Sequence, residues 1–164
     1  LGDVYKRQGY VHKIFKNNHE KGLSDILSGL IEVKSSIEKV PNGAFDFISR
    51  GQVPPNPSEL LMHPRFEALL KWASQEYDLV IIDTPPILAV TDAAIIGRYV
   101  GTTLLVARYE ANTAKEILIS KRRFEQSGVE IKGCILNGVV KKASSYYGYG
   151  YNHYGYSYGE HPKK

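Results

Sequence analysis

The sequence LVIIDTPP, residues Leu79–Pro86, places an aspartate and two prolines directly after an uninterrupted apolar run. Leu79 to Ile82 is too short for a helix, and a continuous apolar stretch of this length is typical of a strand buried on both faces. In an open α/β sheet, ligands bind at the carboxyl ends of the strands. Asp83 is therefore the first candidate for a functional residue.

Helical and apolar patterns alternate on both sides of this run. Phe66, Leu69, Leu70 and Ala73 recur at helical spacing, with Pro64 suited to the first turn, and predict a helix ending near Tyr77. Downstream, the sequence predicts a short helix capped by Thr91 and Asp92 through Ile96, a strand at Leu104–Ala107, a helix from Thr113 that stops before Gly128, and a strand at Ile131–Leu136. Strands that alternate with helices predict an α/β fold with a mostly parallel, doubly wound sheet.

Upstream of the helix the signals are weaker. Leu23–Leu27 is typical of a short helix, and Ala44–Ser49 alternates like a strand, whereas the polar stretch from Ile31 to Pro41 is expected to be irregular. The loop from Arg50 to Pro57 contains prolines that lack backbone donors, so it is not expected to form regular structure.

Composition supports one modest domain followed by a tail. The chain has 164 residues, of which 43% are apolar. After Val140 aliphatic residues vanish and tyrosine and glycine dominate, so no core can form and a flexible tail is expected. We divide the chain into a stub at residues 1–8, a partial domain at residues 9–140 and a tyrosine-rich tail at residues 141–164.

Several function classes are disfavoured by composition. The net charge of +4 comes from cations scattered among acidic residues, so charge alone does not indicate nucleic acid. No run approaches the roughly 18 to 20 apolar residues of a membrane span, and the start lacks a signal-peptide pattern, so the piece is expected to be soluble. No histidine has zinc-ligand spacing, and the single cysteine, Cys134, sits in an apolar run and is expected to be a buried small hydrophobe.

Two side chains at strand ends suit a nucleotide. Asp83 could lie near Mg²⁺, usually through water, while the ion bridges phosphate oxygens; alternatively it caps the turn after the strand. Pro85 and Pro86 prevent a helix from starting at once and so favour a rigid loop beside the carboxylate. Asn137, at the end of the last predicted strand, offers a donor and an acceptor that suit an adenine edge, although a turn asparagine is the commoner role.

A phosphate-binding loop is missing from the sequence. No G-x-x-x-x-G-K-[ST] motif occurs, and no lysine lies in a glycine-rich turn between a strand and a helix. We therefore expect this chain by itself not to catalyse phosphoryl transfer. Because the chain begins with Leu1 and its single methionine is Met62, it is expected to be a fragment or a processed product.

The tail is compatible with three roles. Clustered exposed tyrosines would let several phosphates accumulate, each adding about −1.5 to −2 charges. Alternatively, the tyrosines could stack on single-stranded nucleic acid, although the tail has few cations, or the tail could be a low-complexity terminus without a specific partner. Composition alone favours the last of these. The seven tail tyrosines are Tyr146, Tyr147, Tyr149, Tyr151, Tyr154, Tyr156 and Tyr158.

The order of several motifs resembles the bacterial tyrosine kinases, and more narrowly the polysaccharide co-polymerase type that regulates capsule and exopolysaccharide export in Gram-negative bacteria. The motifs are RGQVPPNPSELL from Arg50, YDLVIIDTPPILAVTDA from Tyr77, VARY from Val106, GCILN from Gly133 and the terminal tyrosine cluster. The resemblance runs from about Gly9 to the end of the chain.

This resemblance implies a P-loop NTPase-like fold of the deviant-Walker group, incomplete at the N-terminus, with ATP and Mg²⁺ as cofactors. It implies that Asp83 is the Walker B aspartate, with a catalytic and cofactor-binding role as a Mg²⁺ ligand through water, that Asn137 faces the base, and that the tail tyrosines are phosphoacceptors. Members of the family assemble as homo-oligomeric rings through neighbouring kinase domains. A cognate tyrosine phosphatase and the polysaccharide export machinery are the implied partners, and the intact protein would lie at the cytoplasmic face of the inner membrane.

The leading hypothesis is thus that the intact protein is an ATP-dependent protein-tyrosine autokinase that acts on its own tail. Two alternatives stay open. The first is a partitioning-type ATPase of the same fold, which would have no need of the tyrosine tail. The second is a non-catalytic regulatory fragment whose tail is an interaction or phosphorylation platform.

Overall fold

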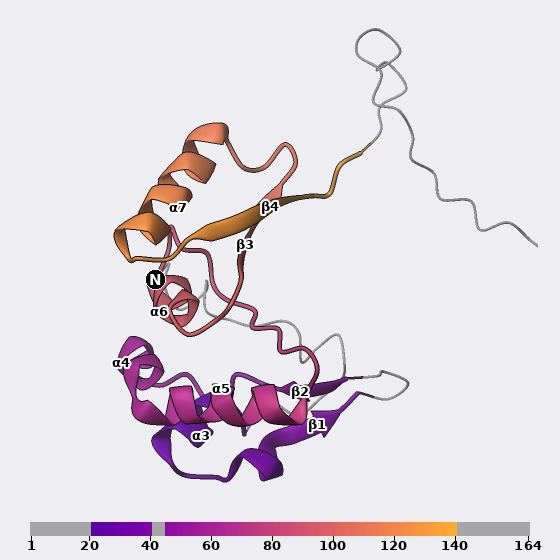
Figure 1. Ribbon diagram of the computed structural model, residues 1–164, viewed down its shortest axis with the longest axis vertical. Helices are drawn as coiled ribbons and strands as arrows, with labels where there is room; N and C mark the ends of the chain where they lie inside the picture. The colour runs from indigo at the N-terminus through magenta and orange to yellow at the C-terminus, as the bar shows by residue number, and fades with distance from the viewer. Residues whose placement is uncertain (1–20, 41–44, 141–164) are drawn as a thin grey trace, which may run out of the picture.

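The structure, a computed structural model, describes residues 21–40 and 45–140. Figure 1 shows a lower group of helices with a small hairpin and an upper group built around two strands. The helices are α3 (Leu23–Ser28), α4 (Pro57–Met62), α5 (Pro64–Glu76), α6 (Asp92–Gly97) and α7 (Ala114–Gln126), with a 3-10 turn η1 (Val33–Ser36). The strands are β1 (Ile37–Lys39), β2 (Asp46–Ile48), β3 (Thr103–Arg108) and β4 (Ile131–Asn137).

The lower group packs around a buried cluster to which α3, α4, α5 and α6 each contribute one side chain: Leu27, Leu61, Phe66 and Ile96. Phe66 is 1% exposed and its ring meets the edge of Tyr99 at 5.5 Å between centroids. The predicted helix ending near Tyr77 is confirmed as α5. A separate helix, α4, precedes it because His63 has an extended backbone, as expected for a residue before proline.

The upper group is a strand–helix–strand unit in which β3 and β4 are parallel neighbours. Thr113 caps α7 by accepting a hydrogen bond from the Glu116 amide, and the helix ends before Gly128, whose φ is +74°. Both limits agree with the sequence prediction. Phe124 and Val129 join Ile87 of the preceding loop in a second buried cluster.

Helix α6 connects the two groups. Its Ala93 and Ala94 belong to the cluster beneath α7, and its Ile96 belongs to the lower cluster. Since α6 also contacts α4 and α7, it is the element through which the two halves pack.

The prediction of a strand at Leu79–Ile82 is wrong for the described residues. The segment has no ladder partner, and the only parallel pair within residues 21–40 and 45–140 is β3 with β4. A strand assignment requires a hydrogen-bonded neighbour, which periodicity cannot supply. Leu79 is 75% exposed and Ile81 is 82% exposed, so the expected burial on both faces is absent too.

Two further expectations are corrected. Cys134 is exposed because β4 is not enclosed: Ile135 and Leu136 beside it are about half exposed. The stretch expected to be irregular contains β1, which pairs antiparallel with β2. A polar strand such as Ile37–Lys39 is specified by its partner rather than by its own pattern.

Residues 1–20 and 141–164 lie outside the described part of the chain, and the stub and tail predictions therefore fall there. Within the described ranges, no helix has both the length and the apolar character that crossing a membrane requires.

Candidate functional site

Asp83 follows the extended segment Leu79–Ile82 and its side chain is exposed. Ile82, directly before it, packs against the lower buried cluster. No hydrogen bond or ion pair joins the Asp83 carboxylate to any other residue that the structure describes. The carboxylate is thus presented to solvent rather than turned into the interior, where a hydrated metal ion can reach it.

The loop after Asp83 is anchored at several points. The carbonyl of Pro86 accepts hydrogen bonds from the amides of Ala89 at 2.9 Å and Val90 at 3.2 Å, which closes a turn. The side chain of Ile87 is buried, and its carbonyl accepts a hydrogen bond at 3.0 Å from Nη1 of Arg123 on α7. Two prolines, a closed turn and a buried anchor make this a rigid connection, so the position of Asp83 is well determined.

Asn137 is the last residue of β4 and lies at the carboxyl edge of the β3–β4 pair. Its backbone carbonyl accepts a hydrogen bond at 2.8 Å from the Tyr109 amide, and its exposed side chain has no hydrogen-bond partner among the described residues. Gly138 follows with a φ of +71°, which turns the chain away at the end of the strand. The amide therefore projects at the edge where open α/β sheets bind ligands.

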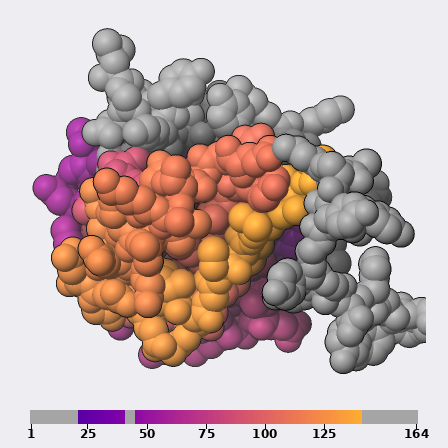
Figure 2. Space-filling model, turned by 90° about the horizontal axis from the view of Figure 1, so that it is seen from above, coloured from indigo at the N-terminus to yellow at the C-terminus, as the bar shows by residue number. Residues whose placement is uncertain are grey.

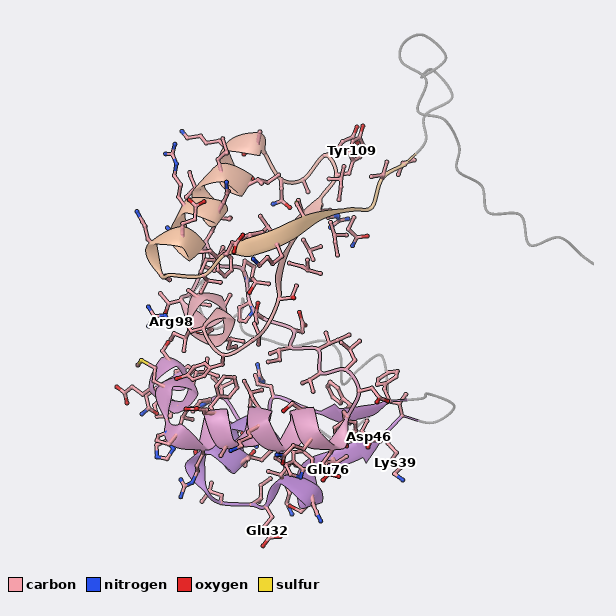
Figure 3. The ribbon with its side chains drawn as sticks, viewed as in Figure 1. Glu32, Lys39, Asp46, Glu76, Arg98 and Tyr109 are labelled. Atoms are coloured by element: carbon pink, nitrogen blue, oxygen red, sulfur yellow. The ribbon has the colours of Figure 1, made fainter. Side chains whose placement is uncertain are left out.

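Arg108 also lies at this edge, although the sequence motifs predict no role for it. It is the register partner of Asn137, and its Cγ lies 3.9 Å from where a Cβ on Gly138 would be. Its amide donates to Oδ1 of Asn112 at 2.8 Å, and Glu110, with a φ of +56°, completes a tight turn. Figure 3 labels Tyr109, which follows Arg108 at this end of the sheet. The signal in the sequence was a cation at a strand's carboxyl end.

The structure brings Arg108 and Asn137 together but does not pair them with Asp83. No ladder within residues 45–140 connects the segment that carries Asp83 to β3 or β4. In the same part of the chain, no three histidine, cysteine, aspartate or glutamate side chains converge as a metal site. Asp83 thus offers one exposed carboxylate, which suits an ion held mainly by water and phosphate oxygens better than an ion enclosed by protein ligands.

Comparison with known proteins gives the family. The chain is 63% identical over 146 residues, 89% of its length, to the putative tyrosine-protein kinase in the cps region of Klebsiella pneumoniae. It is 56% identical over 156 residues to the tyrosine-protein kinase wzc of Salmonella typhi, and 60% identical over 147 residues to the tyrosine-protein kinase etk of Escherichia coli K12.

This chain belongs to the bacterial tyrosine kinases. The predicted family resemblance is thereby confirmed. The chain spans 20% to 22% of the length of those three relatives, while it is itself covered to 89% or more. No protein-family model matches it.

Solved tyrosine kinase domains share its fold. The kinase domain of Escherichia coli tyrosine kinase ETK superimposes with a TM-score of 0.81 at 59% identity, covering 89% of this chain and 57% of that one. The BceF tyrosine kinase domain gives a TM-score of 0.73 at 42% identity over 82% of this chain and 54% of that one. The predicted P-loop NTPase-like α/β class, incomplete in this chain, is confirmed, and with it a fold that binds nucleotides.

Proposed function

We propose that the intact protein is an ATP-dependent protein-tyrosine kinase that phosphorylates its own tyrosine-rich tail and so regulates capsule or exopolysaccharide synthesis and export. The observation that carries this proposal is the 56% to 63% identity, over about nine-tenths of the chain, to proteins named tyrosine-protein kinases, one of them from a cps region. Since the chain spans about a fifth of those relatives, the activity is assigned to the intact protein.

Asp83 and Asn137 are the proposed nucleotide-site residues. An exposed, unpartnered carboxylate at the end of an apolar segment fits a water-mediated ligand of Mg²⁺, and the Asn137 amide fits the donor and acceptor pattern of an adenine edge. Bound MgATP would supply the phosphoryl group and neutralise the charge that develops on it. Because the sequence has no phosphate-binding loop, this chain alone should be inactive.

The proposed acceptors are the seven tail tyrosines in residues 141–164, offered to a neighbouring subunit in a homo-oligomeric ring: Tyr146, Tyr147, Tyr149, Tyr151, Tyr154, Tyr156 and Tyr158. Each phosphate would add about −1.5 to −2 charges, and the resulting repulsion would loosen the ring. A tyrosine phosphatase would reset the tail, and the export machinery would respond to its state. The intact protein would hold this domain, residues 9–140, at the cytoplasmic face of the inner membrane.

The test uses the intact protein and a matched pair of aspartates. Asp78 is exposed, lies five residues before Asp83, and likewise has no partner among the described residues. Asp83→Asn should lower autophosphorylation roughly 100-fold or more, whereas Asp78→Asn should leave it within about threefold. Both variants should keep the circular dichroism spectrum of the parent.

Phosphopeptide mapping locates the product. Phosphate should be found within residues 146–158, and deletion of residues 146–164 should abolish it. Phosphate confined to other peptides, or equal activity of the two asparagine variants, would count against the proposal. ATP hydrolysis that is undiminished by the deletion, without any tyrosine phosphorylation, would instead indicate a partitioning-type ATPase.

A further inference from the structure

Arg108 is the last residue of β3, and its guanidinium makes no hydrogen bond or ion pair with any residue that the structure describes. Most of the other arginines in those ranges differ in this respect. In four of them the guanidinium donates a hydrogen bond to a backbone carbonyl: Arg50, Arg65, Arg98 and Arg123. The charged donors of Arg108 are therefore available for a ligand.

The parallel pair places Arg108 directly beside Asn137. The two are register partners, so their side chains project from the same face of the sheet, on strands about 4.8 Å apart. The stem of Arg108 lies alongside Gly138, because its Cγ is 3.9 Å from where a Cβ on that glycine would be. The Arg108 side chain therefore runs toward the end of β4, on the same side as the Asn137 amide. Figure 2 shows β4 at the surface of the upper group, beside α7.

The turn after β3 fixes the backbone of Arg108. Its amide donates to Oδ1 of Asn112 at 2.8 Å, and its carbonyl accepts hydrogen bonds from the amides of Ala111 at 3.2 Å and Asn112 at 3.0 Å. The amide of Tyr109, which Figure 3 labels, donates to the Asn137 carbonyl at 2.8 Å and joins this turn to β4. A cation on a preorganised turn binds a ligand with little further loss of backbone entropy.

The two neighbouring side chains match the two chemical parts of a nucleotide. The Asn137 amide offers a donor and an acceptor, which suit the edge of an adenine. The guanidinium of Arg108 is permanently charged and presents a planar fork of donors, which fits the oxygens of a phosphate. The α-phosphate is the phosphate nearest the base, from which one ribose separates it. A long cationic side chain one strand away from the residue that contacts the base suits this phosphate.

We propose that Arg108 binds the α-phosphate of the nucleotide whose base Asn137 contacts. This inference rests on the proposed function, which supplies the nucleotide, and adds to it a binding residue on the neighbouring strand. The contact fixes the direction in which the phosphates leave the base. Loss of Arg108 therefore weakens the binding of any adenine nucleotide that carries an α-phosphate and leaves the binding of adenosine unchanged.

The test measures binding to the intact protein by isothermal titration calorimetry, with the Mg²⁺ complex of adenosine 5′-(β,γ-imido)triphosphate as the probe. AMP and adenosine then compete with this probe. Arg108→Gln removes the charge, and Arg108→Lys keeps the charge without the planar fork. Arg122→Gln is the matched control, because Arg122 is exposed on α7 and its guanidinium likewise has no partner in the described part of the chain. Since neither guanidinium has such a partner, each variant should keep the parent's unfolding midpoint.

We expect Arg108→Gln to weaken probe binding roughly tenfold or more, Arg108→Lys to weaken it less, and Arg122→Gln to leave it unchanged. AMP should compete better than adenosine in the parent, and Arg108→Gln should remove that advantage.

Equal affinity of Arg108→Gln and the parent would overturn this inference and leave the proposed function standing. An equal loss of AMP and adenosine binding would assign Arg108 to the base, and an equal loss in Arg122→Gln would indicate general electrostatic attraction; either result overturns the phosphate contact. Failure of the parent to bind the probe would contradict both proposals.

Discussion

The hydrogen bond between Tyr77 and Asp46 joins the end of α5 to strand β2, and its removal gives a measurable change in stability. The Tyr77 hydroxyl donates to Oδ2 of Asp46 at 2.7 Å, and the ring of Tyr77 also meets Trp72 edge-on at 6.0 Å. Figure 3 shows Asp46 beside this end of α5. Tyr77→Phe keeps the ring contact and removes the hydroxyl.

The expected loss follows from the type of bond. Hydrogen bonds to charged groups contribute about 1.5 to 3 kcal/mol when well buried, and partial exposure of Tyr77 reduces this to about 1 to 2 kcal/mol. Urea unfolding followed by fluorescence of Trp72, the chain's single tryptophan, measures the free energy of unfolding. A double-mutant cycle with Asp46→Ala isolates the pair from other effects of either substitution.

Tyr99→Phe is the matched control. Tyr99 also makes an edge-on ring contact, with Phe66, and no hydrogen bond of its hydroxyl involves a residue that the structure describes. Its loss should stay within about 0.5 kcal/mol. A coupling energy between Tyr77 and Asp46 below about 0.3 kcal/mol, or equal losses for the two phenylalanine variants, would refute the reasoning.

The same pair predicts a pH dependence at the alkaline end. The hydrogen bond to Asp46 raises the pKa of Tyr77, with smaller contributions from burial and from the charges of Asp46 and Glu76. A raised folded-state pKa means that the unfolded chain loses the proton first, so the contribution is complete below pH of about 10 and declines as pH rises above it. The difference between the parent and Tyr77→Phe should therefore be constant below about pH 10 and shrink as the pH rises above it.

Two further predictions concern local geometry. Gly51→Ala should destabilise the chain by more than about 1 kcal/mol, because the φ of Gly51 is +78° and a Cβ would lie 2.4 Å from Oδ2 of Asp25. Gly101→Ala is the control, because a Cβ on Gly101 meets nothing within 4 Å, and its unfolding free energy should be nearly unchanged. Thermal unfolding measures both variants. Thr113→Ala should cost about 1 kcal/mol by removing the cap of α7. Bonds from the Thr113 amide and hydroxyl lower the pKa of Glu116, so the contribution of the Glu116 carboxylate to this capping box is present above pH of about 4.5 and should fade below it. An acid titration of Glu116→Ala that parallels the parent would contradict the assignment.

Elements whose limits depend on local chemistry were predictable from the sequence. The capping box of Thr113 and Glu116 and the left-handed Gly128 fix both ends of α7, and all three are readable in the sequence. The same holds for α5, because Pro64 can only begin a helix at its first turn. These signals act within a few residues and need no knowledge of the rest of the fold.

Elements that depend on a distant partner were not predictable in this way. Ile37–Lys39 pairs with Asp46–Ile48, but its polar sequence does not predict a strand. Conversely, the apolar run at Leu79–Ile82 has the composition of a buried strand but no neighbour to pair with in the described chain. Cys134 was misassigned for a related reason, since an apolar run implies burial only when both faces of its sheet are covered.

The candidate site likewise has a part that is determined by local contacts and a part that depends on distant segments. The loop after Asp83 is held by contacts that this chain contains, namely the turn on the Pro86 carbonyl and the bond from Arg123 to Ile87, so the carboxylate is presented without help from another segment. Local contacts do not bring Asp83 into a common site with Arg108 and Asn137, because no described strand ladder connects their segments. The position of Asp83 is therefore fixed by contacts within this chain, whereas no described contact fixes its geometry relative to Arg108 and Asn137. Stability measurements on Asp83→Asn should accordingly show little change, because no described residue pairs with the carboxylate, while an effect on nucleotide affinity is expected in the intact protein.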